Sequence, residues 1–195
     1  MICGRPLSYD PDKALDAAMH LFWEQGYEAT SISDLMEVMG LSKSSLYQRF
    51  GGKKELFLQC MGRYTEEVGA RLRIRLDQAD SGLAFIQELL LHSATEAEGK
   101  ECRRGCLLMN TACEFAQQDP DIAARIGNGF EGLQVILRLA VLRSQKEGEI
   151  NASLNADGLA GFLMSTIAGL KTVVKGGADE HQVREIVAIS LRALR

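Results

Sequence analysis

Residues 30–57 read TSISDLMEVMGLSKSSLYQRFGGKKELF, and this stretch decides the fold. It holds two short segments with helical apolar spacing, 30–39 and 41–50, separated by Gly40. Hydroxyl residues open each segment and a glycine closes it, which is the pattern of a capped helix. Two short helices joined by a tight glycine-containing turn present the second helix to the major groove of DNA. The stretch therefore predicts a helix-turn-helix.

The second helix of this pair has an inner and an outer side. Leu46 and Phe50 are four residues apart, so they share the side that faces inward, and Ser42 is expected to cap the helix. Lysine and glutamine can bond to base edges, while serine and tyrosine hydroxyls commonly donate to phosphate oxygens. The outer side carries residues of these types: Lys43, Ser44, Tyr47 and Gln48.

Further phosphate-binding groups flank this helix. Thr30 and Ser31 begin the preceding helix, and Lys53 and Lys54 begin the following one. Helix N-termini add free N–H groups and partial positive charge that favour anions. The same residues also suit the solvated faces of a small helical bundle, so spacing alone leaves both interpretations open.

The rest of the chain also shows helical periodicity, and the alternation typical of half-buried strands is nearly absent. Asp10 and Pro11 are expected to open a first helix that ends at Gly26. A long amphipathic helix is expected from Lys53 to about Asp77, joining the first helices to the rest. Five more helices are expected at about 83–98, 105–117, 121–147, 155–175 and 180–194. The sequence therefore predicts an all-α protein.

Composition limits the classes of function. The 195 residues suffice for a small domain fused to a larger one. The net charge of −4 would repel a polyanion, so DNA binding requires cationic side chains that are placed at the contact surface itself. We see no apolar stretch near the length of a membrane span and no secretory signal, so we expect no membrane association and a cytoplasmic location. Five cysteines do not make an even disulfide framework, so we expect reduced thiols.

The run from Ala14 to Phe57 resembles the N-terminal head of the TetR/AcrR family of one-component transcriptional repressors. The resemblance rests on 14–18, 21–32, 35, 39–50 and 53–57 in order and spacing. It implies a three-helix DNA-binding bundle over residues 1–54. It also implies a helical effector-binding and dimerisation bundle over residues 55–195.

The resemblance implies a regulator, in the first instance a repressor, that a small-molecule or electrophilic effector releases from a palindromic double-stranded operator. It implies a homodimer held through the last two helices, and no cofactor. Arg49 departs from the family pattern, because many relatives have histidine there. The DNA contacts that it implies fall on Ser31, Lys43, Ser44, Ser45, Tyr47, Gln48 and Lys53, with Thr30 as a neighbour.

The most distinctive chemistry in the body is the segment 102–113, which contains three cysteines. Cys106 is expected to begin a helix beside Arg103 and Arg104, where a thiolate would be favoured, and Cys113 would share its face. A subset of the resembled family senses electrophiles through a cysteine at this position. The alternative is that Cys106 and Cys113 are small apolar fillers of a pocket wall.

Other interpretations of the body remain open. A metal site formed by Cys102, Cys106 and Cys113 with His92 is one such interpretation. Their spacing fits no recognised zinc module, so this interpretation is weak and we expect no metal. A helical thiol enzyme with Cys106 as nucleophile is the alternative function, but no base lies near it in sequence, so we expect no enzyme. An organic effector would contact apolar side chains with scattered polar groups: His92, Met109, Asn110, Phe130 and Phe162, besides Met61, Tyr64, Phe85 and Leu89.

Overall fold

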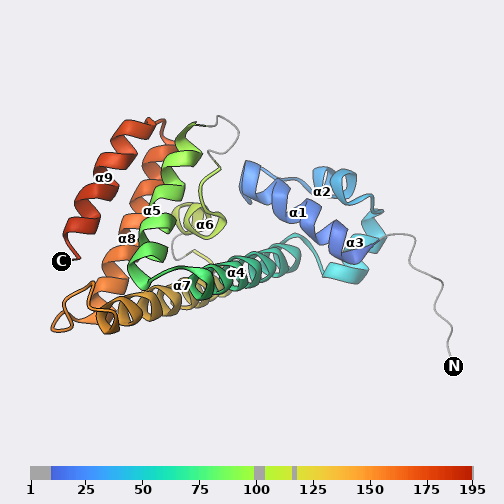
Figure 1. Ribbon diagram of the computed structural model, residues 1–195. Coiled ribbons are helices and arrows are strands. Elements are labelled where there is room, and N and C mark those ends of the chain that lie inside the picture. Colours follow the sequence, from blue (N-terminus) through green and yellow to red (C-terminus); the bar gives the residue numbers. More distant parts are fainter. Residues whose placement is uncertain (1–9, 99–103, 116–117, 195) are drawn as a thin grey trace, which may run out of the picture.

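The computed structural model describes residues 10–98, 104–115 and 118–194, and these ranges contain nine α-helices and no strand. Figure 1 shows a head of three short helices at one end and a bundle of longer helices at the other. The helices are α1 (Pro11–Gln25), α2 (Ile32–Met39), α3 (Lys43–Phe50), α4 (Lys53–Gln78), α5 (Gly82–Glu98), α6 (Leu107–Phe115), α7 (Pro120–Lys146), α8 (Ala156–Lys175) and α9 (Glu180–Arg192).

The predicted helices are confirmed, each within about two residues of its expected ends wherever the structure describes those ends. The predicted caps are present as well. Asp10 caps α1 by accepting from the Asp12 backbone N–H at 3.0 Å, and Ser42 caps α3 by accepting from the Ser45 N–H at 3.2 Å. Gly40 ends α2 in the left-handed conformation, with φ 63° and ψ 33°, which glycine adopts without a Cβ clash.

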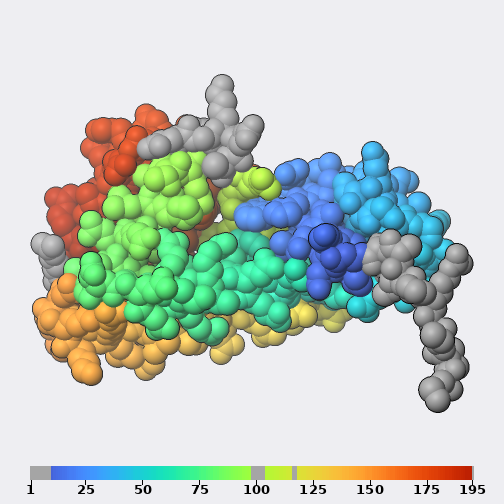
Figure 2. Space-filling view, turned by 45° about the vertical axis from the view of Figure 1, so that its right-hand side comes forward, coloured from blue at the N-terminus to red at the C-terminus, as the bar shows by residue number. Residues whose placement is uncertain are grey.

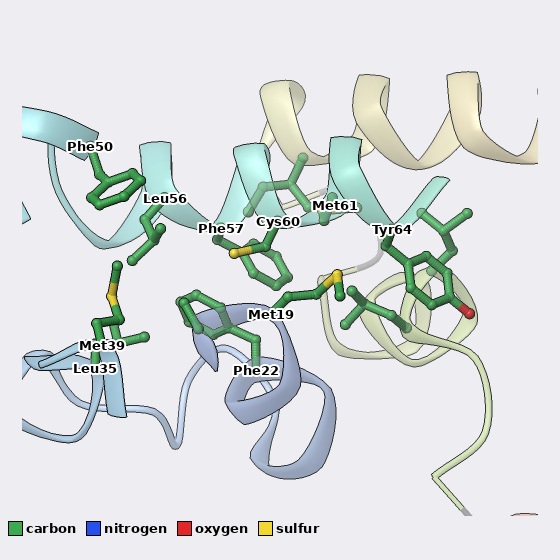
Figure 3. Packing of buried hydrophobic residues seen from close by; sticks show 14 of the residues in the cluster. Met19, Phe22, Leu35, Met39, Phe50, Leu56, Phe57, Cys60, Met61 and Tyr64 are labelled. Atoms are coloured by element: carbon green, nitrogen blue, oxygen red, sulfur yellow. The ribbon is translucent and has the colours of Figure 1, made fainter. Parts of the chain in front are cut away.

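One hydrophobic core joins the head to the first half of α4. Figure 3 shows Phe22 of α1 and Leu35 and Met39 of α2 pointing toward Leu56, Phe57 and neighbouring residues of α4. Phe22 and Phe57 lie edge to face with ring centroids 4.9 Å apart. Phe115 of α6 belongs to the same core, so the body contributes to the packing of the head.

A second core fills the body. It consists of the far half of α4 with α5, α7, α8 and α9, and buries Phe85, Leu137, Leu163 and Val187. Figures 1 and 2 show α4 running from the head along the body, so that one continuous helix contributes to both cores. The division at residues 54 and 55 remains a prediction, since the helix that follows it packs with both parts.

Helix α8 corrects one expectation from the sequence. By length and composition alone its 20 residues could cross a membrane, although we expected no such stretch. In the structure it packs against α5, α7 and α9 as a member of the bundle. Only 22% of its apolar window is fully buried within the single chain, and the rest is partly or fully exposed.

Candidate nucleic-acid interface and central cavity

Helix α3 presents the outer side that its sequence predicts. Leu46 and Phe50 are buried and hold the helix against the core of the head. Ser45 is half-buried, with its hydroxyl 2.9 Å from that of the capping Ser42. Four side chains are exposed on the outer side: Lys43, Ser44, Tyr47 and Gln48. The helix can therefore offer cationic, amide and hydroxyl groups to a partner surface without disturbing its own packing.

The start of α2 also presents polar groups. The Ser31 hydroxyl accepts from the Asp34 N–H at 3.1 Å, and the Asp34 carboxylate accepts from the Ser31 N–H at 2.9 Å. These hydrogen bonds lower the pKa of Asp34. Ser31 is exposed, as a DNA contact requires, whereas Thr30 is fully buried and its hydroxyl donates to the Gly26 carbonyl at 2.6 Å. Thr30 is thus removed from the candidate contacts because its side chain packs inside the head.

The two lysines that begin α4 have different surroundings. Lys53 lies with its Nζ 4.3 Å from the centroid of the Tyr27 ring, at the surface of the head. Lys54 instead bonds to Asp119 at 2.8 Å and Asp121 at 2.7 Å, next to the start of α7. These carboxylates raise the pKa of Lys54 and tie the head to the body. Lys53 therefore remains a candidate phosphate contact, and Lys54 does not.

Arg49, the departure from the family pattern, lies in the last turn of α3. Its side chain is exposed, and its guanidinium carbon lies 5.8 Å from the centroid of the neighbouring Phe50 ring. The side chain makes no ion pair within the described part of the chain. Arg49 can therefore reach a phosphate from the end of the helix.

The body contains a cavity of about 140 Å³ where six helices meet. Figure 2 shows the surface hollowed in the region where α4, α5 and α6 meet α1. The cavity is mostly apolar, with charged side chains from α4, α5 and α8, and a mostly apolar lining with a few polar groups is usual for a small-molecule site. It is lined by Trp23, Tyr64, Val68, Arg71, Leu72, Arg75, Leu89, His92, Glu96, Gly105, Cys106, Met109, Leu133, Ile136, Leu137, Met164, Ile167 and Lys171.

Two polar contacts organise the cavity wall. The Lys171 ammonium of α8 forms an ion pair with the Glu96 carboxylate of α5. The Tyr64 hydroxyl of α4 donates to the Cys106 thiol, with oxygen and sulfur 3.4 Å apart. Burial raises the pKa of Tyr64, so it remains a protonated donor at neutral pH. Partial burial lowers the pKa of His92, which favours its neutral form.

The structure brings together only some of the predicted effector residues. Cys106, Met109 and His92 line the cavity, as do Tyr64 and Leu89. The other predicted residues lie elsewhere, because helical spacing does not determine which neighbour covers a face. Asn110 and Cys113 line a separate crevice beside α1, Phe130 and Met61 pack in the core of the head, Phe85 is buried in the body core, and Phe162 is 39% exposed on the outer face of α8.

The cysteine environment also differs from the expectation. Cys106 lies directly before α6, as predicted, and is buried, but Cys113 is exposed and does not share its cavity. The Arg104 guanidinium bonds to Glu24 at 3.2 Å and lies over the Trp23 ring, so it is directed toward α1. Arg103 and Cys102 lie outside the described residues. Within the described ranges, no group of three or more metal-ligating side chains is assembled.

Most of the lining residues were not predicted from the sequence, and among these the charged and aromatic ones are Trp23, Arg71, Arg75, Glu96 and Lys171. They come from α1, α4, α5 and α8, and nothing in their local spacing sets them apart from residues of solvated or packed faces. They become a group only because helices distant in sequence meet around the cavity. The ion pair between Glu96 and Lys171 spans 75 positions of the chain.

A further surface feature is an apolar face that the chain leaves uncovered. Large apolar side chains are exposed on the last three helices, in contrast to the buried inner stripe of α9. The C-terminal segment therefore has two sides, because Val183, Val187 and Leu194 pack inside the chain while Ile186 is exposed. The exposed side chains are Val135, Leu139 and Leu142 of α7, Phe162 and Val173 of α8, and Ile186 and Ile189 of α9.

Helix α6 connects the cavity with the head. Cys106, directly before the helix, and Met109, in its first turn, line the cavity. Near its end, the Glu114 carboxylate accepts from the backbone N–H groups of Tyr27 at 3.1 Å and Glu28 at 2.8 Å. These residues belong to the turn before α2. A displacement of α6 would therefore move the Glu114 carboxylate and alter its hydrogen bonds to the turn that precedes α2.

Replacing Glu114 by Gln is expected to speed hydrogen exchange of the Tyr27 and Glu28 amides by about tenfold, because a neutral amide oxygen accepts weaker bonds than a carboxylate. Amide exchange followed by NMR measures this effect. Glu131→Gln, an exposed change on α7, is the control and should leave both rates unaltered. Unchanged rates in the Glu114 variant would mean that the turn is held by its own hydrogen bonds.

Comparisons with known proteins agree with both halves of the chain. Residues 14–60 match the profile of bacterial regulatory proteins, tetR family, and residues 82–189 match the tetracyclin repressor-like C-terminal domain. The HTH-type transcriptional repressor ComR of Escherichia coli (strain K12) is 31% identical over 97% of this chain and 90% of its own length. The uncharacterized HTH-type transcriptional regulator YezE of Bacillus subtilis (strain 168) is 29% identical over 98% and 99%.

A solved structure extends this similarity to the whole architecture. A cysteine mutant of the TetR family transcriptional regulator CifR, complexed with 26bp double-strand operator DNA, superposes with a TM-score of 0.86. It is 29% identical in sequence, and the match covers 98% of this chain and 100% of that chain. The order of the head and the helical body is therefore the same in both proteins.

Proposed function

This chain belongs to the tetR family of bacterial regulatory proteins, and we propose that it represses transcription from a palindromic operator until a small molecule occupies the central cavity. It is a DNA-binding transcriptional regulator with the family's all-helical fold. The single observation that carries the proposal is the outer side of α3, where four polar side chains are exposed while Leu46 and Phe50 are buried. We assign it no catalytic activity and a cytoplasmic place of action, where the chromosome lies.

The proposed DNA contacts are those candidates whose side chains are accessible. Lys43 and Gln48 are suited to base edges, and hydroxyl groups with Lys53 are suited to phosphates. The N-terminus of α3 adds free N–H groups, which helps a protein of net charge −4 to hold a polyanion. The proposed set is Ser31, Lys43, Ser44, Ser45, Tyr47, Gln48 and Lys53, with Arg49 as an additional phosphate contact.

A band-shift experiment with the promoter region of the chain's own gene tests the proposal. A dimer places two heads on one duplex, so a palindrome with half-sites about 34 Å apart, or a multiple of that distance, should bind preferentially. The measurement is made at moderate salt, because phosphate contacts alone give binding without sequence preference. Absence of sequence-preferring binding would contradict the proposal.

The uncovered apolar face of α7, α8 and α9 is the proposed dimer interface. Its exposed apolar side chains lie on helices that pack side by side, and large exposed apolar patches are typical of protein interaction sites. Gly158 and Gly169 lie on the exposed side of α8 and would permit close approach of a second helix. This placement supports a homodimer through the last two helices, extended by the exposed stripe of α7.

Replacing Ile189 by Arg is expected to convert the dimer into a monomer, because Ile189 is 61% exposed in the single chain and would bury a charge in the interface. Size-exclusion chromatography with light scattering measures the mass. Ile74→Arg places the same charge on an exposed site of α4, a helix outside the proposed interface, and should leave the mass unchanged. A dimeric Ile189 variant would place the interface elsewhere.

The proposed effector acts by favouring a conformation in which the two heads have the wrong spacing for the operator. The cavity, helix α6 and Glu114 give a contiguous physical connection from the binding site to the head. Cys106 lines this cavity, so its thiol is placed to meet an electrophilic effector that enters. The alternative is that Cys106, which is buried, only fills space in the cavity wall.

Replacing Cys106 by Ser is expected to preserve operator binding and abolish the release of DNA by an alkylating agent such as N-ethylmaleimide. Cys113→Ser is the matched control, because Cys113 is exposed and outside the cavity. Band shifts with and without the reagent measure release, and mass spectrometry reports which thiol reacts. Unchanged release from the Cys106 variant would assign this thiol to packing.

A helical thiol enzyme is the competing function. It would need a base beside Cys106, but the polar partner that the described residues provide is the Tyr64 hydroxyl, which donates to the sulfur. Turnover of a thiol substrate that disappears in the Cys106→Ser variant would favour this alternative.

A further inference from the structure

We infer that the central cavity binds a small organic acid, with an apolar body of about the size of one ring and a terminal carboxylate. This inference rests on the proposed function of the cavity as the effector site. It concerns the chemical class of the effector, which neither the fold nor the DNA-binding head specifies.

The first observation is an unpaired donor. Within the described ranges, the indole Nε1 of Trp23 is the one buried side-chain nitrogen or oxygen atom without a hydrogen-bond partner. Trp23 lines the cavity. A buried N–H without an acceptor is unfavourable, and native proteins pair almost all of them. A ligand that supplies an acceptor oxygen would remove this cost.

The second observation is an unpaired cation near the same place. Arg71 lines the cavity and makes no ion pair with the described residues, whereas Arg75, one turn further along α4, bonds to Glu88 at 2.8 Å. Arg71, Trp23 and Tyr64 also line an adjoining surface cavity, so they gather at one end of the central cavity. Asp16 and Glu67 are the acidic residues of that adjoining cavity, and both form ion pairs with Arg63, so neither neutralises Arg71.

The remaining charges of the cavity are balanced. The Glu96 carboxylate forms an ion pair with Lys171, so it offers no unpaired negative charge to a cationic ligand. His92 is held toward its neutral form. The Tyr64 hydroxyl already donates to Cys106. The groups without a protein partner are therefore a buried donor, the Trp23 N–H, and the cation of the solvent-exposed Arg71, which together match a carboxylate that accepts hydrogen bonds from both.

The size and the lining limit the rest of the ligand. A cavity of about 150 Å³ lined by aliphatic side chains is known to hold benzene. This cavity measures about 140 Å³, and α7 and α8 line it with Leu133, Ile136, Leu137, Met164 and Ile167. A single ring or a short branched chain therefore fits this space.

The test uses three acids and their amides: benzoate, phenylacetate and isovalerate against benzamide, phenylacetamide and isovaleramide. Trp23 is the single tryptophan of the chain, so its fluorescence reports directly on the cavity, and calorimetry gives an independent affinity. We expect at least one acid to bind about tenfold or more tightly than its amide, because the amide lacks the charge.

Two substitutions assign the preference to this site. Arg71→Gln should remove it by weakening the acid about tenfold or more, while Arg73→Gln, an exposed change on the same helix and outside this cavity, should leave it intact. Trp23→Phe, followed by calorimetry, should weaken the acid about threefold to tenfold. Acids that bind no more tightly than their amides, or a preference that survives Arg71→Gln, would overturn the inference.

The failure of this inference is distinguishable from failure of the proposed function. Release of operator DNA by a neutral molecule bound in the cavity would overturn the acid class and leave the regulator proposal intact. Failure of the ligand-free protein to prefer any operator would contradict the regulator proposal, while the tryptophan titration would still decide the ligand class.

Discussion

Replacing Lys43 and Gln48 together by Ala is expected to lower operator affinity at least about a thousandfold. Both side chains are exposed on the outer side of α3. A good base contact contributes about 1–3 kcal/mol, and two contacts in each head of a dimer amount to about 4–12 kcal/mol. Fluorescence anisotropy with a labelled operator measures the loss, and binding to unrelated DNA measured in parallel shows whether specificity is lost first.

The control for this double variant removes a positive charge elsewhere. Lys146 is exposed at the end of α7, away from the head, and Lys146→Ala should leave operator affinity within about twofold. Thermal unfolding of both variants should match the parent, because exposed substitutions change stability by about 0.5 kcal/mol or less. Retained affinity in the double variant would mean that α3 is not the recognition helix.

Replacing Phe57 by Ala is expected to destabilise the protein by about 3–5 kcal/mol. Phe57 is 1% exposed, and its ring centroid lies 4.9 Å from the centroids of Phe22 and Tyr27. It therefore joins the head to α4, and the cavity left behind would be bounded by rigid rings that cannot collapse into it. Urea unfolding at a fixed protein concentration measures the change, since dimerisation makes stability depend on concentration.

Ile74→Ala is the matched control for Phe57→Ala. Ile74 lies on the same helix but is 55% exposed, so its removal should change the free energy of unfolding by about 0.5 kcal/mol or less. A similar small effect at Phe57 would contradict the packing of the head against α4. Operator affinity should fall in the Phe57 variant because the head loses its support.

The local elements were predictable because their signals lie within a few residues. Ser42 bonds to a backbone N–H three positions away, and Gly40 adopts its left-handed conformation for the turn it occupies. Leu46 and Phe50 share a face through helical geometry alone. The order of head and body then follows from the resemblance of residues 14–57 to one family, which the whole-chain comparisons confirm.

Features that depend on distant neighbours were not predictable in this way. Thr30 has the residue type of a phosphate contact, but the packing of α1 against α2 buries it. Lys54 resembles Lys53 in sequence, yet two carboxylates at the start of α7 occupy it. Phe162 has the spacing of a core residue and faces outward.

The sequence by itself determined the helix-turn-helix, its caps and the residues that α3 can offer to DNA, because hydrogen bonds and periodicity within ten residues are sufficient for them. Only the tertiary structure decided which residues line the cavity. Trp23, Arg71, Glu96 and Lys171 come from four different helices, and Cys106 lies directly before a fifth. Periodicity states which residues share a face of one helix, whereas the long-range packing of the bundle decides which faces meet and which groups are left without a partner.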